Sequence, residues 1–276
     1  MYPMLQTNKK TYKYEDKTLI MGILNVTPDS FSDGGNYNEL DLAIKHAKQL
    51  VQQGADIIDI GGESTRPGHT PVSEEEEIER VIPVVKAVSE QVDVPISVDT
   101  YKAKVAELSL QNGASIINDI WGAKKEPEIA KVAARFNAPI ILTHNREESP
   151  YSSLIEDVLE DLRESIQLAL DSGVVPENII IDPGIGFAKT YEENVQVMRE
   201  MDRLRELDYP LLLGTSRKSI VANTLKLPVD RRDVGATVCY GMTKGTEIIR
   251  VHNVEMHAQA VKMMDKLLGK GWNTSG

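Results

Sequence analysis

Eight short apolar segments, each followed by a stretch of helical periodicity, constrain the fold of this chain more than any other feature. The segments are rich in β-branched residues and almost continuously apolar, which is typical of strands buried on both faces. They comprise residues 19–24, 57–60, 96–98, 115–118, 139–143, 179–181, 211–213 and 248–251. An open doubly wound sheet usually ends after five or six strands, whereas eight strand–helix units over about 250 residues fit a closed barrel. We therefore predict an α/β fold of the (β/α)8 TIM-barrel type.

The segments between these strands carry their own helix signals. Ser73 with Glu76 three residues later predicts a capping box, and the acidic run 74–77 suits the positive end of a helix dipole. We interpret that run as helix-end electrostatics and not as a metal site. Glycines at positions 54, 113 and 173 are predicted to end their helices. The predicted helices cover residues 40–53, 73–91, 102–111, 126–136, 154–172, 192–207, 219–225, 235–244 and 254–268.

Composition excludes several classes of protein. With 41% apolar and 26% charged residues, the chain has the composition of a packed globular domain, and no composition break divides it. We predict one domain over residues 1–276, with residues 1–17 as a polar N-terminal extension. No apolar run reaches the roughly 18 residues of a membrane span, and the N-terminus lacks the apolar centre of a signal peptide, so we predict a cytoplasmic protein without a membrane partner. A net charge of −11 argues against nucleic-acid binding.

Polar clusters follow the apolar segments, and the carboxyl ends of barrel strands converge on one mouth. Asp99, Asn118 and Asp182 would bring three acceptor-bearing side chains together there. Such a set suits a ligand with several N–H donors, such as an aminopyrimidine edge, and Lys218 and Arg250 add donors for a ring carbonyl. The alternative is that the polar residues at 118–119 and 182–184 only cap the helices that follow.

Other residues at the predicted mouth suit a phosphate group. The segment 214–219 runs from a strand into a helix start, where free N–H groups bind anions. Arg250 and His252 follow the last strand, and Arg66 could add a third cation. Asn25 and Asp33 offer hard oxygen ligands for a magnesium ion shared with phosphate oxygens. A zinc site is not expected, because metal-ligand spacing is lacking among the remaining histidines at positions 46, 69, 144 and 257.

Eight motifs occur in a fixed order along the chain, namely NVTPDSFSDGG, DIGGESTRPG, SVDTYKA, INDIWGA, ILTHNR, DPGIGFAK, GTSRKS and RVHNV. In this order and spacing they resemble the dihydropteroate synthases of bacterial folate biosynthesis, a pterin-binding family, from about residue 18 to residue 268. The resemblance implies a (β/α)8 barrel and a transferase. Its reaction would condense 6-hydroxymethyl-7,8-dihydropterin pyrophosphate with p-aminobenzoate, giving 7,8-dihydropteroate and pyrophosphate.

The resemblance also implies a role for individual residues. The pterin would be bound by Asp99, Asn118, Asp182, Lys218 and Arg250. The p-aminobenzoate site would comprise Thr65, Pro67, Phe187, Lys218 and Ser219. Pyrophosphate would meet Asn25, Arg66, Arg250 and His252, with Mg2+ as the cofactor at Asn25. Loops 26–36 and 64–70 would close over the site, the first through Phe31 and Asp33. Catalysis would depend on Asp99, Lys218, Arg250 and His252.

The implied mechanism is a dissociative substitution at the pterin methylene. It depends on positioning and electrostatics rather than on a strong base, because an aryl amine is neutral at pH 7. We accordingly expect no catalytic triad of Ser216, His252 and Asp182. Sulfonamides would inhibit as mimics of p-aminobenzoate, and the protein would be a homodimer. Thr143 and Asn253 stand where Met and Asp are common in the family, and segment 227–235 is short.

Two rival functions remain open from the sequence. A methyltetrahydrofolate-binding methyltransferase would share the pterin contacts but would not need the loops around Ser30–Asp33 and Ser64–Gly68. A catalytically silent homologue that only binds pterin or phosphate would be expected to lack at least one residue that the reaction needs. The residues whose loss would indicate this are all present: Asn25, Asp33, Thr65, Lys218 and His252.

Overall fold

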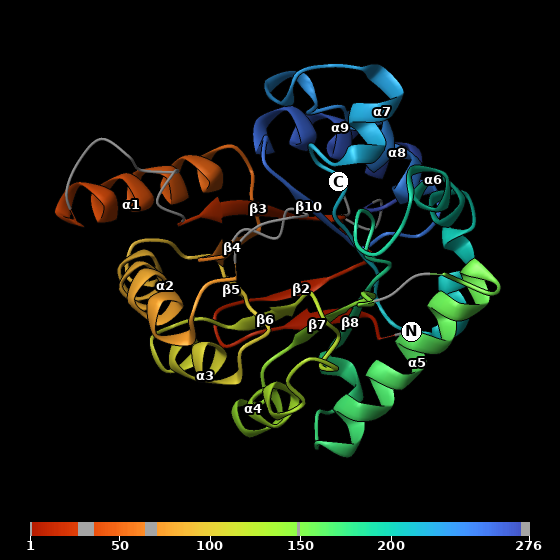
Figure 1. Cartoon of the computed structure of the whole chain (residues 1–276). Helices are drawn as coiled ribbons and strands as arrows, with labels where there is room; N and C mark the ends of the chain where they lie inside the picture. Colours follow the sequence, from red (N-terminus) through yellow and green to blue (C-terminus); the bar gives the residue numbers. More distant parts are fainter. Residues whose placement is uncertain (1, 27–35, 64–70, 148–149, 272–276) are drawn as a thin grey trace.

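Eight parallel strands surrounded by helices form a barrel (Figure 1). The computed structural model describes residues 2–26, 36–63, 71–147 and 150–271. The strands are β3 (Leu19–Asn25), β4 (Ile57–Gly61), β5 (Ile96–Asp99), β6 (Ile116–Asp119), β7 (Ile140–Thr143), β8 (Ile179–Asp182), β9 (Leu212–Leu213) and β10 (Ile248–Val251). They are hydrogen-bonded in the order β8-β7-β6-β5-β4-β3-β10-β9, and a parallel bridge between Ile181 and Leu211 joins the two ends. The predicted (β/α)8 barrel is confirmed.

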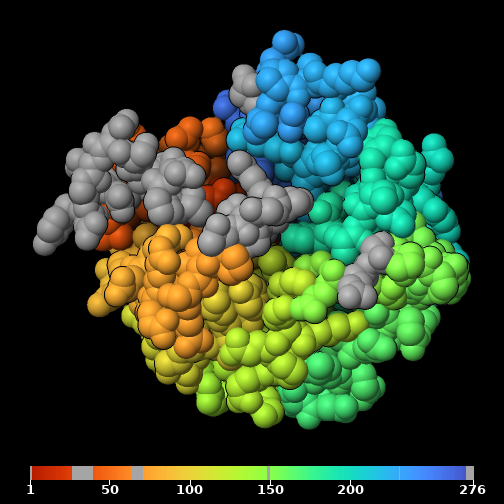
Figure 2. Space-filling model, viewed as in Figure 1, coloured from red at the N-terminus to blue at the C-terminus, as the bar shows by residue number. Residues whose placement is uncertain are grey.

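The helices lie outside the strands and follow one another around the axis. Figure 2 shows this progression as a sequence of colours from orange through yellow and green to blue. The helices are α1 (Asn36–Gln52), α2 (Glu74–Ser89), α3 (Ala103–Gln111), α4 (Glu128–Phe136), α5 (Leu154–Asp171), α6 (Tyr191–Arg199), α7 (Ser219–Leu225), α8 (Gly235–Thr243) and α9 (Val254–Leu267). Short 3-10 helices span Pro176–Asn178, Met201–Leu207 and Val229–Arg231. No helix in the described part of the chain is both long and apolar enough to cross a membrane.

The predicted capping box at the start of α2 forms in part. The Ser73 hydroxyl accepts a hydrogen bond from the Glu76 amide at 3.1 Å and so caps α2, whereas the Glu76 carboxylate binds Arg80. The prediction of one continuous helix over residues 192–207 is wrong. Helix α6 ends at Arg199, and a separate 3-10 helix begins at Met201. Between them Glu200 has φ −102° and ψ 14°, which lies outside the α-helical region.

One residue of the acidic run at 74–77 also departs from the prediction. Glu77 is fully buried and accepts a hydrogen bond from Lys102 Nζ at 2.5 Å, while Lys102 also reaches Glu63 at 2.6 Å. Burial raises the pKa of Glu77, although Lys102 opposes the shift. The run therefore combines helix-end charges with one buried ion pair that ties α2 to the start of α3.

The barrel interior has an apolar floor near the amino ends of the strands. Seven of the strands each contribute at least one inward residue to this floor. The N-terminal hairpin of β1 (Met4–Gln6) and β2 (Thr11–Lys13) adds Leu5, and Tyr14 directly after β2 packs there too. Segment 1–17, predicted to be polar, therefore packs two buried side chains against this floor. The strand residues of the floor are Leu19, Met21, Ile57, Ile116, Ile141, Ile180, Leu212 and Ile248.

Polar side chains replace the apolar ones one step further along five of the strands, whereas β3 has Ile23 at this step and β9 is followed by Gly214. Side chains in a strand alternate between faces, so the residue two positions after a floor residue points inward again. These second positions are Asp59, Asn118, Thr143, Asp182, Gly214 and Arg250, and Asp99 is paired in register with Asn118. Barrel closure thus stacks a polar layer on an apolar floor at the carboxyl ends of the strands.

Candidate active site

A guanidinium held between two carboxylates forms the centre of the polar layer. Arg250 of β10 donates from Nε to Asp59 Oδ2 and from Nη2 to Asp99 Oδ2, each at 2.6 Å. Asp59 is fully buried, and the Arg250 side chain is only 16% exposed. Burial raises the pKa of Asp99 to about 7 although Arg250 opposes the shift. Burial acts to lower the pKa of Arg250, but Asp59 and Asp99 outweigh it and raise the pKa. The guanidinium is therefore a permanent positive charge inside the barrel.

Asp59 belongs to this layer, but no role was predicted for it even though it begins the motif DIGGESTRPG. It lies inside an apolar segment between Ile58 and Ile60, which belong to the layer between strands and helices. Asn118 Nδ2 donates to Asp59 Oδ2 at 3.2 Å, so Asp59 links Asn118 to Arg250. Its other oxygen, Oδ1, is buried without a hydrogen-bond partner within the described residues. A charged residue in an otherwise apolar strand was the available signal, because a buried carboxylate requires a partner.

Asp182 and Lys218 form a second part of the layer. The Asp182 carboxylate is 5% exposed and accepts a hydrogen bond from the Gly184 amide at 2.8 Å. Burial raises the pKa of Asp182 against the opposing charge of Lys218. Lys218 Nζ donates to the Ile185 carbonyl and lies 4.6 Å from the centre of the Phe187 ring, a cation–π contact. The structure thus brings Lys218 and Phe187 together, as their predicted roles require.

The alternative interpretation of these polar residues as helix caps is wrong for both segments, because α4 begins only at Glu128 and α6 at Tyr191, where Thr190 is the cap. Asp119 accepts hydrogen bonds from the Trp121 amide at 2.8 Å and the Ala123 amide at 2.6 Å, so it stabilises the turn after β6. Asn118 faces the interior instead and contacts Asp59. Asp182 combines both functions, because one carboxylate oxygen binds the turn while the residue belongs to the inward layer.

His252 lies beside Ser216 at the rim. Its Nδ1 is 2.9 Å from Ser216 Oγ, and Ser216 Oγ donates to Asp233 Oδ1 at 3.1 Å. Because the hydroxyl hydrogen is directed to Asp233, Nδ1 is the donor to Ser216. Arg217 binds both oxygens of Asp233, with contacts of 3.1, 3.0 and 2.6 Å. The Ser216 hydroxyl lies between the Asp233 carboxylate and the imidazole, an order that differs from a charge-relay triad, in which the imidazole is the middle group.

Asp233 is also a residue that the sequence did not assign. It lies in the short segment 227–235, and its side chain is only 7% exposed. Hydrogen bonds to Arg217 outweigh burial and lower its pKa. The segment predicted to differ from the family therefore supplies the carboxylate that fixes Ser216 and Arg217.

The remaining predicted residues have different positions. Asn25 is exposed at the end of β3, and Ser219 is exposed at the first position of α7. Thr143 is buried beside Asp182 in the register of β7 and β8, and Asn253 caps α9 by accepting from the Met256 amide at 3.1 Å. No group of three or more His, Cys, Asp or Glu side chains suited to a metal lies within the described residues. The predicted site residues outside the described part of the chain are Phe31, Asp33, Thr65, Arg66 and Pro67.

Comparisons with known proteins agree on one family. The family of pterin binding enzymes matches residues 21–252. The dihydropteroate synthase of Bacillus subtilis is 55% identical over 270 residues, which cover 97% of this chain and 95% of that protein.

Solved structures give the same result. A dihydropteroate synthase of Clostridium difficile, crystallised in the presence of pteroic acid, has a TM-score of 0.90 and 47% identity, covering 93% of this chain and 98% of that one. The enzyme of Xanthomonas albilineans with 4-aminobenzoic acid has a TM-score of 0.91 and 36% identity, covering 97% of this chain and 99% of that one. With the polar layer at the barrel mouth, these matches show that the chain belongs to the pterin-binding enzymes and, among them, to the dihydropteroate synthases.

Proposed function

We propose that the mouth of this barrel binds 6-hydroxymethyl-7,8-dihydropterin pyrophosphate and p-aminobenzoate and joins them to 7,8-dihydropteroate, releasing pyrophosphate. The observation that carries the assignment to individual residues is the polar layer itself. Carboxylate and amide acceptors lie beside two cations over an apolar floor, inside a chain that belongs to the dihydropteroate synthases. Enzymes of this family transfer a group between substrates. For this protein we propose that the transferred group is the pterin-methyl group and that its acceptor is an aryl amine.

The pterin is proposed to lie against Asp99, Asn118 and Asp182. An ionised Asp182 accepts hydrogen bonds from the amino group and ring N–H, while Lys218 donates to the ring carbonyl. Arg250 is held flat between Asp59 and Asp99, which leaves a guanidinium face for stacking on the ring. Because all these groups are paired before substrate arrives, little reorganisation is needed on binding.

The p-aminobenzoate ring is proposed to pack on Phe187 and the aliphatic part of Lys218. Its carboxylate would approach Ser219 at the start of α7, where backbone N–H groups favour an anion. Thr65 and Pro67 would complete this pocket, and a loop carrying Phe31 and Asp33 would cover it. Sulfonamides present a similar aniline and anionic end, so we propose that they compete for the same place.

Pyrophosphate is proposed to meet His252, Arg250, Arg66 and Asn25. The His252 ring is oriented by its contact with Ser216, and as an imidazolium it would donate to a departing phosphate oxygen. Asn25 offers one exposed amide oxygen, which fits a Mg2+ ion held mainly by pyrophosphate and water. Such an ion, when bound, would supply positive charge to the leaving group.

The chemistry requires breakage of the methylene C–O bond and formation of a C–N bond to the aniline. Arg250 and His252 would stabilise the charge that develops on pyrophosphate as the C–O bond breaks. The electron-rich pterin held by Asp182 and Lys218 would stabilise the methylene cation. The aniline nitrogen then donates its lone pair and releases a proton to solvent, so the reaction needs no buried strong base.

Pyrophosphate release that depends on p-aminobenzoate tests this function. We expect the purified protein to release one pyrophosphate per dihydropteroate formed, and to release little without the aryl amine. The matched measurement is transfer of a methyl group from methyltetrahydrofolate, which the rival methyltransferase would catalyse. Pterin binding without any turnover would instead identify a silent homologue.

The rate should fall on the alkaline side as Lys218 loses its proton. Burial lowers the pKa of Lys218 to about 8 although Asp182 opposes the shift. Below this pKa the ammonium is charged and donates to the pterin carbonyl; above it the charge is lost, so kcat/KM for the dihydropterin pyrophosphate should decrease. Steady-state kinetics from pH 7 to pH 10 measure this limb. In Lys218→Arg the positive charge persists above pH 8. If kcat/KM of that variant still decreases near pH 8, the decrease is caused by the titration of another group.

We also propose a cytoplasmic homodimer. Six large apolar side chains are exposed between residues 225 and 268, around α7, α8 and α9, which fits a surface covered by a second copy. They are Leu225, Val229, Tyr240, Met263, Leu267 and Leu268. Light scattering measures the mass in solution: twice the 30.6 kDa of one chain supports the dimer, and 30.6 kDa contradicts it.

A further inference from the structure

The loop after β8 has a backbone conformation that needs external support. Gly184, Gly186 and Ala188 have φ values of 67°, 89° and 47°, all in the left-handed region. A Cβ at Gly184 would lie 1.9 Å from the His144 carbonyl oxygen, so the loop touches the end of β7 directly. For Ala188, which has a Cβ, the left-handed conformation is sterically unfavourable. Contacts outside the loop must therefore hold it in place.

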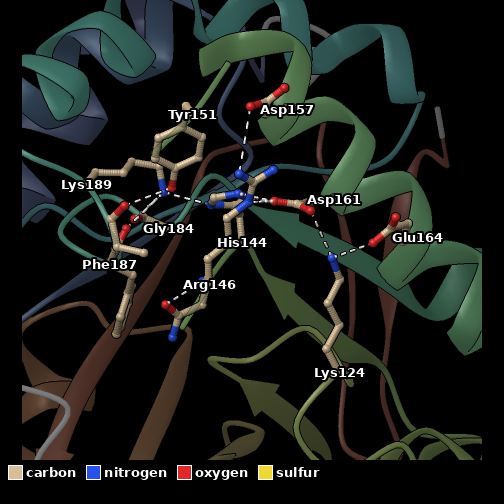
Figure 3. A network of polar contacts seen from close by, with 12 residues as sticks. Lys124, His144, Arg146, Tyr151, Asp157, Asp161, Glu164, Gly184, Phe187 and Lys189 are labelled. Atoms are coloured by element: carbon tan, nitrogen blue, oxygen red, sulfur yellow. Dashed lines mark hydrogen bonds and ion pairs between the residues drawn. The ribbon is translucent and has the colours of Figure 1, made fainter. Parts of the chain in front are cut away.

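Lys189 supplies several of these contacts at once. Its Nζ lies 3.1 Å from the Gly184 carbonyl, 3.1 Å from the Phe187 carbonyl and 2.8 Å from His144 Nδ1 (Figure 3). The charged form of Lys189 has three N–H groups, and each has one acceptor here. Burial lowers the pKa of Lys189 to about 7, although Asp182 opposes the shift. Two of the acceptors belong to the loop and one to the residue after β7, so Lys189 joins the loop to the barrel wall.

His144 continues the connection toward helix α5. Because Lys189 donates to Nδ1, the hydrogen of the neutral imidazole lies on Nε2, which is 2.9 Å from Asp161 Oδ2. Burial lowers the pKa of His144 to about 4, which agrees with a neutral ring. Asp161 also accepts hydrogen bonds from Arg146 and, at 3.2 Å, from Lys124 (Figure 3). The imidazole thus has a single tautomer and a fixed orientation.

Tyr151 supports the same loop independently. Its hydroxyl donates to the Ala188 carbonyl at 2.9 Å, while its ring lies against the Arg146 guanidinium at 4.7 Å. On its other side the loop presents the Ile185 carbonyl and the Phe187 ring to Lys218. A displacement of the loop would therefore move both the aromatic surface and the carbonyl that orients the Lys218 ammonium.

We propose that Lys189 is a positioning residue for the aryl-amine substrate: by binding the Gly184 and Phe187 carbonyls and His144, it fixes Phe187 against Lys218. Lys189 acts through the loop and has no contact with the substrate of its own. The inference rests on the proposed placement of p-aminobenzoate at Phe187 and Lys218. Among the proposed pterin contacts, Asp182 and Lys218 also touch this loop, through the Gly184 amide and the Ile185 carbonyl. Asp99 and Asn118 are held by Arg250 and Asp59, which lie outside the network.

The test compares Lys189→Met with the matched variant Lys124→Met. Both remove a lysine that belongs to the same network, but Lys124 binds Asp161 and Glu164 on its outer side and not the loop carbonyls that Lys189 binds. We expect Lys189→Met to raise the KM for p-aminobenzoate about tenfold or more, because several hydrogen bonds to the loop are lost. The dissociation constant of the dihydropterin pyrophosphate, measured by calorimetry, should rise by a clearly smaller factor, because Asp99, Asn118 and Arg250 do not depend on the loop. Lys124→Met should leave both constants unchanged.

Tyr151→Phe provides a second, milder test that does not bury or remove a charge. It deletes the hydrogen bond to Ala188, so it should raise the same KM in the same direction by a smaller factor. If Lys189→Met folds and its KM for p-aminobenzoate is unchanged, the proposal is wrong. If Lys189→Met does not fold, an unchanged KM for p-aminobenzoate in Tyr151→Phe overturns the proposal instead. Equal losses for both substrates would overturn it too, since they indicate general destabilisation. If the wild-type protein lacks pyrophosphate release dependent on p-aminobenzoate, the proposed function fails instead.

Discussion

Replacing Arg250 by methionine should abolish measurable synthesis and reduce the free energy of unfolding by about 3–5 kcal/mol at pH 8. The guanidinium is the shared partner of Asp59 and Asp99, at 2.6 Å from each. Without it two buried carboxylates face each other with no cation between them. Removing one partner from a buried ion cluster costs far more than removing a surface charge, because desolvation of the remaining charges is no longer compensated.

The loss of stability in Arg250→Met should depend on pH with a definite sign. Burial already raises the pKa of Asp99, and removing the opposing guanidinium raises it further above its unfolded value. The folded variant then binds protons more tightly than the unfolded chain, so its stability should increase as the pH falls from 8 toward 5.5. Urea unfolding at both pH values measures the difference. Adding Asp99→Asn should restore part of the stability at pH 8 but not the activity.

Arg205→Met is the matched control for this experiment. Arg205 also binds a buried carboxylate, at 2.7 Å from Glu247, but that pair lies at the amino end of β10, away from the mouth. We expect it to lower stability while kcat and both KM values stay within about twofold. If Arg250→Met is as stable as the wild-type protein at pH 8, the central role of the guanidinium in the polar layer is wrong.

Replacing Asp182 by asparagine should weaken pterin binding by at least about tenfold while the fold remains intact. Asn removes the negative charge and puts an N–H donor where an acceptor oxygen faced the pterin edge. Charge-assisted hydrogen bonds contribute roughly 1.5–3 kcal/mol each, and 1.4 kcal/mol corresponds to a factor of ten. The amide oxygen can still accept the Gly184 amide, so the turn after β8 should keep its conformation. Calorimetry with the pterin measures the affinity.

Asp119→Asn separates pterin recognition from the general effect of losing a buried carboxylate. Asp119 is as deeply buried as Asp182 and accepts two backbone amides, but it stabilises a turn and does not face the interior layer. We expect this variant to lose stability and to retain pterin affinity. Equal pterin affinity in Asp182→Asn and the wild-type protein would remove Asp182 from the binding site.

The sequence by itself determined the elements of the barrel, because the signals for strands and helix ends are local. Continuous β-branched runs predicted all eight strands, and Ser73 predicted the start of α2 through a contact only three residues away. The sequence also placed Asp99, Asn118 and Asp182 at strand ends. Their inward orientation follows from the two-residue alternation along each strand once the strands form a barrel.

Only the tertiary structure decided which of these residues meet. Asp59 and Arg250 are 191 positions apart, and Lys189 and His144 are 45 apart, so neither pair leaves a pattern in the local sequence. Asp59 lies inside an apolar strand, and Lys189 follows a glycine-rich turn without any sign of a partner. Barrel closure brings β10 beside β3 and the β8 loop against β7, and burial then forces each charge to find a counterpart. The identity of that counterpart depends on three-dimensional proximity, which the chain acquires only when it folds.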